Sequence, residues 1–256
     1  MSRFPASVQT IAATTTGERT QSHARTRPGR SRFYVGISVA MAAIVVVGFW
    51  ATYFGPMLRG NITRPWVIQV HGAVYAGWMV LLLAQVALVA AGRTRTHRRL
   101  GQFGIWYGWL VLVMGVIVSF AAPLLHLAAG EWDMDRAAAF LIIPLGDMVL
   151  FAGFFGGAVA YRSKPDVHKR LIVLATVALL FAAIGRMSFI QSTPLLLLIW
   201  VSPVLVALAH EAITRRRLDP VYVIGLVILM AWAGRVAVAQ SDPWMRTGRA
   251  LLRSLM

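Results

Sequence analysis

Seven long apolar stretches alternate with short polar connections, and no other feature constrains the fold of this chain as strongly. A helix rises about 1.5 Å per residue, so each stretch can cross a hydrocarbon core of about 30 Å. The sequence therefore predicts an all-α fold, a polytopic transmembrane helix bundle of seven spans. The alternative is six spans, because Pro194 and Pro203 border or interrupt the sixth stretch. The stretches lie at 34–57, 66–91, 102–127, 137–161, 170–190, 194–213 and 220–240.

Composition agrees with this class and excludes several others. Hydrophobic residues make up 58% of the chain and charged residues 13%, against about 25% charged in soluble domains. The net charge of +16 would suit a nucleic-acid binder, but the basic residues stand in short runs between apolar stretches instead of covering one face. The absence of cysteine excludes thiolate zinc sites, iron–sulfur clusters and c-type haem attachment.

The distribution of basic residues predicts the orientation. They concentrate in the first 33 residues and in every second connection after them, and the intervening connections hold few. By the positive-inside rule, the N-terminus and the basic connections face the cytoplasm of a bacterial inner membrane. Residues 1–33 are expected to be a disordered basic tail, and 241–256 a short interfacial helix. The basic connections contain Arg93, Arg95, Arg98, Arg99, Arg162, Lys164, Lys169, Arg170, Arg215, Arg216 and Arg217.

Polar residues within the spans are the candidates for function, because they are costly there. In the second span His71, Trp78 and Gln85 are seven residues apart, which places them near one face of a helix. Asp147 lies in the fourth span, and Arg186 and Arg235 lie near the outer ends of the fifth and seventh.

An unpaired charge in hydrocarbon is unfavourable, so Asp147 is expected to pair with Arg186 or Arg235. Together with His71 these residues would form an outer polar site. Two interpretations stay open for it. One is a structural ion pair with a hydrogen-bonded histidine; the other is a site for an anionic ligand, a quinone headgroup or a haem propionate.

Three histidines fall at the cytoplasmic ends of spans, namely His97, His168 and His210. Histidines at one depth on different helices can ligate haem, and haem b is the candidate cofactor. The alternative is that they cap helix starts at the membrane interface. No metal-binding motif of closely spaced histidines supports a separate metal site.

Two borders of the chain repeat each other. His97-Arg98-Arg99-Leu100 and His168-Lys169-Arg170-Leu171 each follow an apolar span with a polar residue inside it. Residues 66–190 carry this pattern together with His71, Gln85 and Arg186, and here the chain resembles a family of uncharacterised bacterial multi-pass membrane proteins known as a domain of unknown function. The resemblance implies that His71, Gln85, His97, His168 and Arg186 are the positions that bind a ligand. A more distant likeness links the chain to b-type transmembrane cytochromes.

Three hypotheses of function follow. The leading one is a redox-associated membrane protein that binds haem or quinone between the second and fifth spans. The second is a small transporter or sensor in which Asp147 and its arginine partner handle a proton or an anionic solute. The third is a cofactor-free partner in a membrane complex or homo-oligomer.

Overall fold

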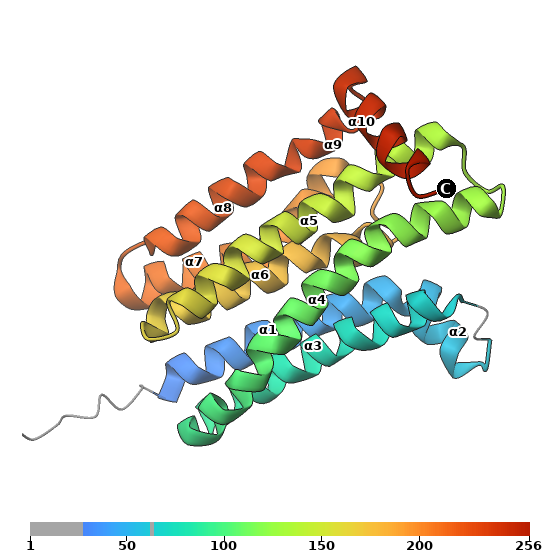
Figure 1. Cartoon of the computed structure of the whole chain (residues 1–256). Coiled ribbons are helices and arrows are strands. Elements are labelled where there is room, and N and C mark those ends of the chain that lie inside the picture. Colours follow the sequence, from blue (N-terminus) through green and yellow to red (C-terminus); the bar gives the residue numbers. More distant parts are fainter. Residues whose placement is uncertain (1–27, 62–63) are drawn as a thin grey trace, which may run out of the picture.

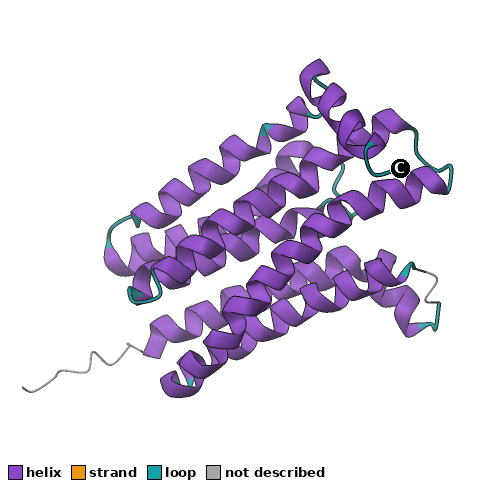
Figure 2. Cartoon of the chain, viewed as in Figure 1, coloured by secondary structure: helices purple, strands orange, loops and turns teal. Residues whose placement is uncertain are grey.

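The computed structural model describes residues 28–61 and 64–256, and it is helical with no strand in these two ranges (Figures 1 and 2). Most of the predicted tail at 1–33 lies outside the described residues. The first helix begins at Pro28, so the last six residues of that predicted tail are helical. The elements are α1 (Pro28–Phe49), a π-helical turn (Trp50–Phe54), α2 (Gly55–Leu58), α3 (Trp66–Ala90), α4 (Thr94–Ala128), α5 (Met134–Ala160), α6 (Pro165–Ile184), α7 (Thr193–Arg215), α8 (Pro220–Ala233), α9 (Arg235–Val238) and α10 (Asp242–Arg253).

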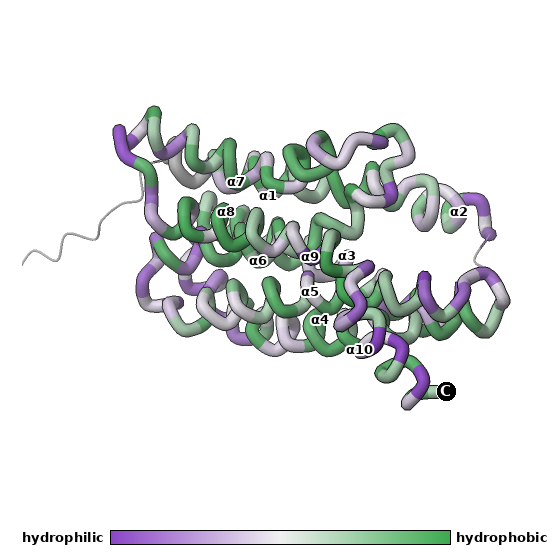
Figure 3. The backbone as a smooth tube through the Cα atoms, turned by 90° about the horizontal axis from the view of Figure 1, so that it is seen from above, coloured by the Kyte–Doolittle hydropathy of each residue, from purple (hydrophilic) through white to green (hydrophobic). Residues whose placement is uncertain are grey.

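Seven segments of the described chain are long and apolar enough to cross a membrane. This confirms the predicted all-α bundle with seven helices that could span a membrane. The first span runs through α1, the π-helical turn and α2, and the seventh joins α8 to α9. Hydrophobic residues cover the lengths of the helices, whereas hydrophilic ones gather at the two ends of the bundle and in α10 (Figure 3). The chain is a multi-pass membrane protein.

The helix α6 lies at the centre of the bundle and packs against α1, α5, α7 and α8, while α3 packs against α1 and α4. The largest fully buried side chains on these helices include Phe151, Leu174 and Trp200. We call the left side of Figure 1 the basic end; it carries the connections 91–93, 161–164 and 216–219. The opposite end carries the connections 59–65, 129–133 and 185–192, together with α10.

The expected boundaries at the basic runs were wrong by up to two turns of helix. α4 begins at Thr94 and α6 at Pro165, so His97 and His168 are each the fourth residue of a helix and not the last of a loop. The reversal before α4 is short because Gly92 adopts a φ of +72°, a conformation open to glycine at little cost. Proline at the first position of α6 suits a helix start.

The chain after the seventh span forms the helix that was predicted within 241–256. α10 lays Met245 and Leu252 against Ala137 and Leu141 of α5. The indole Nε1 of Trp244 donates to the carbonyl oxygen of Ala138 at 2.9 Å. One face of α10 is therefore held against the opposite end of α5.

Candidate functional site

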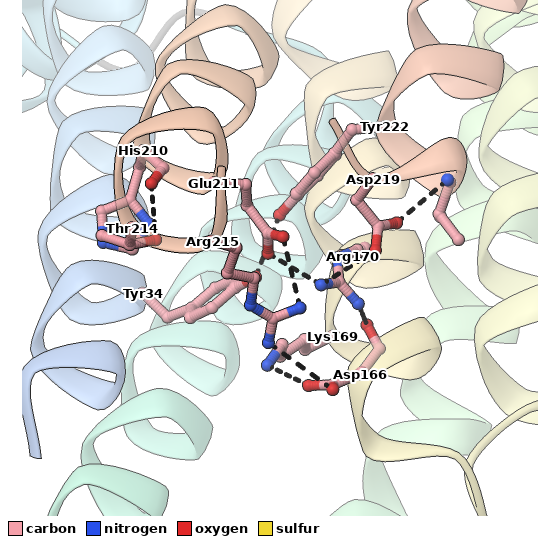
Figure 4. Close-up of polar contacts among 11 residues, drawn as sticks. Tyr34, Asp166, Lys169, Arg170, His210, Glu211, Thr214, Arg215, Asp219 and Tyr222 are labelled. Atoms are coloured by element: carbon pink, nitrogen blue, oxygen red, sulfur yellow. Dashed lines mark hydrogen bonds and ion pairs between the residues drawn. The ribbon is translucent and has the colours of Figure 1, made fainter. Parts of the chain in front are cut away.

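The densest polar cluster joins α6, α7 and α8 at the basic end (Figure 4). Arg170 is 1% exposed and Glu211 is 3% exposed, so both side chains are buried. Arg170 Nη2 lies 2.7 Å from Glu211 Oε1 and 3.1 Å from Asp219 Oδ2. Its Nη1 donates to the Asp166 carbonyl oxygen at 2.5 Å. Asp219 also accepts a hydrogen bond from Val221 N–H at the start of α8. One arginine thus ties three helices together.

A second layer of ion pairs surrounds this arginine. Arg215 Nη1 lies 3.3 Å from Glu211 Oε2, and Lys169 Nζ lies 2.6 Å from Asp166 Oδ1. The six charges cancel, three cations against three carboxylates. We interpret the cluster as a structural clamp, because its charges balance and leave no net charge for a ligand, although the buried Arg170 Nε has no hydrogen-bond partner. Its members are Asp166, Lys169, Arg170, Glu211, Arg215 and Asp219.

Glu211 and Asp219 were not among the residues predicted to be functional. The available signal was a carboxylate inside the otherwise apolar sixth stretch, since buried acidic residues require a partner.

Gln85 and His97 come together at the basic end. The Gln85 amide oxygen accepts from Gly101 N–H at 3.0 Å, and its nitrogen donates to the carbonyl oxygen of His97 at 3.2 Å. The same amide nitrogen lies 2.6 Å from His97 Nδ1. Both backbone groups have fixed roles, so the amide must present N–H to the ring. His97 therefore accepts at Nδ1 and carries its hydrogen on Nε2.

His168 has the other tautomer. Its Nδ1 lies 2.8 Å from the carbonyl oxygen of Ala158, which can only accept, so Nδ1 carries the hydrogen and Nε2 holds a lone pair. His97 and His168 are close enough to interact electrostatically. Ligation of haem iron by His97 Nε2 would require its contact with Gln85 to break, so these two histidines are not prepared as a matched axial pair. Haem b stays a prediction for an absorption spectrum to test.

The third histidine at this end does not join the other two. His210 stacks on Phe33 of α1 with ring centroids 3.8 Å apart. The residues described by the structure contain no group of three or more histidine or acidic side chains placed to hold a metal.

The stripe of the second span also separates. Trp78 is in the core, where its Nε1 donates to Thr176 Oγ1 at 3.3 Å and its ring contacts Phe151 and Phe155 edge-on. His71 lies 14 residues before Gln85, or about 21 Å along the helix. The three residues therefore lie at different depths of the bundle: His71 toward the opposite end, Trp78 in the core and Gln85 at the basic end.

Asp147 pairs with Arg235, one of its two expected partners. Both side chains are buried, and Arg235 Nη2 donates to Asp147 Oδ1. Arg235 also donates from Nη1 to the Trp232 carbonyl oxygen at 3.0 Å and lies over the Phe181 ring, 4.7 Å from its centroid. The pair connects the middle of α5 to the break between α8 and α9.

The other two residues of the expected outer site make contacts of their own. Arg186 donates from Nη1 to the Ala182 carbonyl oxygen at 2.7 Å and lies over the Phe49 ring. His71 stacks on Tyr75 with ring centroids 4.1 Å apart. Arg235, and not Arg186, is therefore the ion-pair partner of Asp147.

A groove of about 580 Å³ opens on the outside of the bundle next to the Asp147–Arg235 pair. We call it the lateral groove. Its walls are largely apolar, and Arg235 is the only charged residue lining it. The lining residues are Ile142, Leu145, Gly146, Val149, Ala231, Trp232, Gly234, Arg235, Val238 and Trp244.

Two buried N–H groups at this groove have no acceptor. Trp232 Nε1 and Arg235 Nε are buried without a hydrogen-bond partner. A Cβ placed on Gly146 would lie 2.6 Å from Trp232 Nε1 and 2.9 Å from Arg235 Nε. Both donor groups therefore pack directly against the glycine of α5, a close approach that only a residue without a side chain allows. An unpaired buried donor costs about 1–3 kcal/mol, which an incoming acceptor would recover.

Comparison with known proteins adds no relative. No family model, no curated protein and no solved structure matches the chain. A functional conclusion therefore depends on the geometry of these residues.

Proposed function

We propose that the protein binds a lipophilic ligand with a neutral, hydrogen-bond-accepting headgroup, of the quinone class, in the lateral groove. The observation that carries the proposal is the convergence of Trp232 Nε1 and Arg235 Nε on Gly146 without an acceptor. A quinone carbonyl that reaches Trp232 Nε1 and Arg235 Nε from the groove would take the hydrogen bonds that the protein leaves unmade. The proposal keeps the redox-associated role expected from the sequence and assigns it to a different pair of helices.

The charge of the groove favours a neutral headgroup. Arg235 is already neutralised by Asp147 behind it, so an anionic headgroup would meet no net positive charge. Desolvating a carboxylate or phosphate there would also be costly. A neutral carbonyl can accept from Trp232 Nε1 and Arg235 Nε, and its desolvation beside the apolar lining of the groove costs less than that of a charged group.

The size and position of the groove agree with this ligand. A volume of about 580 Å³ falls in the usual range of small-molecule sites, about 300–1,000 Å³. Val149 and Val238 line the groove and are also exposed on the outside of the membrane spans. A ligand dissolved in the bilayer would enter sideways and leave its tail among the lipids.

The test is calorimetric titration of the purified chain in nanodiscs with a short-tail benzoquinone. We expect saturable binding. Trp232→Phe keeps the ring and removes one donor, so it should weaken affinity about fivefold, the equivalent of about 1 kcal/mol. Gly146→Ala should abolish binding, because its Cβ displaces both donors.

The matched control is Gly153→Ala on the same helix, where a Cβ meets nothing within 4 Å; binding should stay unchanged. Saturable binding that is insensitive to both groove variants would place the ligand elsewhere. No binding at all would remove the proposal.

A second candidate is a small transporter or sensor of a proton or anionic solute. The observation that favours it is the interruption of the seventh span at Gly234, beside the buried Arg235. Discontinuous helices that place an ion pair inside the membrane are typical of transporters. Asp147→Asn would then abolish flux in proteoliposomes, whereas Trp232→Phe would leave flux unchanged.

We also propose a bacterial inner membrane as the location, with the basic end in the cytoplasm. The support is the arginine-rich alternation of the connections, which follows the positive-inside rule.

A further inference from the structure

Three segments meet at the opposite end of the bundle, on the side away from the lateral groove. They are the π-helical turn after α1, the start of α3 and the residues after α6. The Tyr53 ring lies so close to Gly72 that a Cβ there would be 2.9 Å from it, and Gly48 of α1 packs against the backbone of Ala183. These close contacts bring Thr52, His71 and Arg186 into one neighbourhood, which we call the outer cup.

Two arginines of the outer cup have no acidic partner within the described ranges. Arg186 lies over the Phe49 ring at 4.8 Å, and Arg64 Nη2 donates to the Thr52 carbonyl oxygen at 3.0 Å. Their side chains remain exposed. Shielding by the surrounding helices and the nearby Arg64 charge lower the pKa of Arg186 below its usual value. The two cations therefore repel one another with no carboxylate between them.

The cup also holds polar atoms that lack partners. Thr52 Oγ1 and His71 Nδ1 are buried and make no hydrogen bond. His71 is within electrostatic reach of Arg186. A hydroxyl, an imidazole and two guanidinium groups thus share one end of three helices, and each guanidinium keeps further N–H groups beyond the one that it donates to a backbone carbonyl.

The two buried arginines in the described part of the bundle differ from these exposed ones. Arg170 and Arg235 each contact a carboxylate. We interpret both as structural arginines, because each charge is balanced within the protein. The described acidic residues of the opposite end lie in the α4–α5 connection, in α5 or in α10, and no ion pair joins one of them to the cup. Among the described residues no carboxylate balances the two arginines of the cup, so their positive charge is available to an external anion.

We propose that the outer cup binds an oxyanion of the phosphate class, held by Arg64 and Arg186 with Thr52 and His71 at its floor. Guanidinium groups match the oxygens of a phosphate in pairs, and two of them balance its charge. A membrane phosphate group and free phosphate share this chemistry. The inference is independent of the quinone proposal, which concerns another site.

The first arm of the test uses inorganic phosphate. The full chain is purified in phosphate-free neutral detergent, and its thermal midpoint is followed against phosphate and against chloride at equal ionic strength. We expect phosphate to raise the midpoint more than chloride does, since a ligand of the folded state stabilises it. Arg186→Gln or Arg64→Gln should weaken the apparent phosphate affinity about tenfold, the equivalent of one charge-assisted hydrogen bond.

The second arm uses nanodiscs of phosphatidylglycerol against nanodiscs of phosphatidylcholine. A response to phosphate in detergent that both variants lose supports a free anion as the ligand. A response only to phosphatidylglycerol that both variants lose supports a lipid headgroup.

Arg136→Gln is the control, because this arginine is exposed at the same end and lies over Trp132, away from the cup. The proposal is overturned if neither probe stabilises the protein, or if Arg136→Gln reduces the effect as much as Arg186→Gln. Arg186→Lys keeps the charge and loses the planar fork, so partial recovery would confirm that guanidinium geometry matters.

Discussion

At the scale of single residues, the bundle separates arginines by their partners. Arg170 and Arg235 are buried against carboxylates, whereas Arg64 and Arg186 are exposed without any in the described structure. The first pair of residues stabilises the fold, and the second pair leaves positive charge for a ligand. Sequence position alone does not distinguish them, because Arg186 and Arg235 stand at similar depths in their spans.

Asp147→Asn should destabilise the protein strongly, because Arg235 would stay buried without its counter-charge. The expected loss is about 3–5 kcal/mol, as for other broken buried pairs. The double variant Asp147→Leu with Arg235→Met should recover most of it, since an apolar replacement of both partners removes the desolvation cost. Unfolding in mixed micelles measures both.

The control for this pair is Asp135→Asn. Asp135 faces Arg249 at the surface, with more than half of the Asp135 side chain exposed, so its loss should cost less than about 1 kcal/mol. Equal losses for Asp147→Asn and Asp135→Asn would mean that the buried pair contributes no more than an exposed one.

At the scale of elements, the clamp around Arg170 determines how α6, α7 and α8 sit at the basic end. α7 and α8 are joined by the short connection 216–219, and Asp219 both caps α8 and contacts Arg170. Arg170 of α6 therefore also holds the connection 216–219 in place through Asp219. The outer cup has no such internal charge balance among the described residues.

Glu211→Gln should loosen this end of the bundle. Arg170 would keep Asp219 and lose its closest carboxylate, for an expected cost of about 3–5 kcal/mol. Hydrogen exchange should rise in the last turns of α7 and the first turns of α6, with little change in α3. Arg217→Gln, on an exposed residue in the same connection, should leave exchange unchanged; a rise of the same size there would contradict the clamp.

The elements were predictable where the signal is local. Hydropathy over about 20 residues gave seven spans, because each span must satisfy its backbone within itself. Ion pairs between residues far apart in the sequence were harder to predict. Asp147 and Arg235 are 88 residues apart and Arg170 and Glu211 are 41 apart; the first pair was anticipated from charge cost, and the second was missed because Glu211 was not recognised as a buried charge.

The candidate site shows the same limit. The spacing of His71, Trp78 and Gln85 predicted a common face but not a common site, because a helix 25 residues long carries one face past several neighbours. The lateral groove was not predicted, since it depends on Gly146 of α5 facing the break between α8 and α9. An isolated glycine in an apolar stretch gives no sign of what approaches it.

At the scale of the whole molecule, the two ends of a membrane-spanning bundle face different compartments, and seven spans put the N- and C-termini on opposite sides. The quinone proposal needs only the bilayer, but the outer cup needs a defined side, because its anion comes from one aqueous phase or from one leaflet. The orientation therefore decides whether the cup meets periplasmic or cytoplasmic phosphate. The arginine-rich connections at the basic end favour the periplasmic side for the cup.

Reporter fusions test this orientation directly. Alkaline phosphatase, which is active only in the periplasm, should be active when fused after Met256, and a fluorescent protein that folds in the cytoplasm should be dark there. The same reporters inserted at Gly92, in the α3–α4 connection, should give the opposite result, because that connection carries Arg93 and precedes the basic first turns of α4. Cytoplasmic signals at both positions would mean that one of the seven apolar helices does not cross the membrane. Periplasmic phosphatase activity at Gly92 together with a cytoplasmic C-terminus would invert the bundle and move the outer cup to the cytoplasmic face.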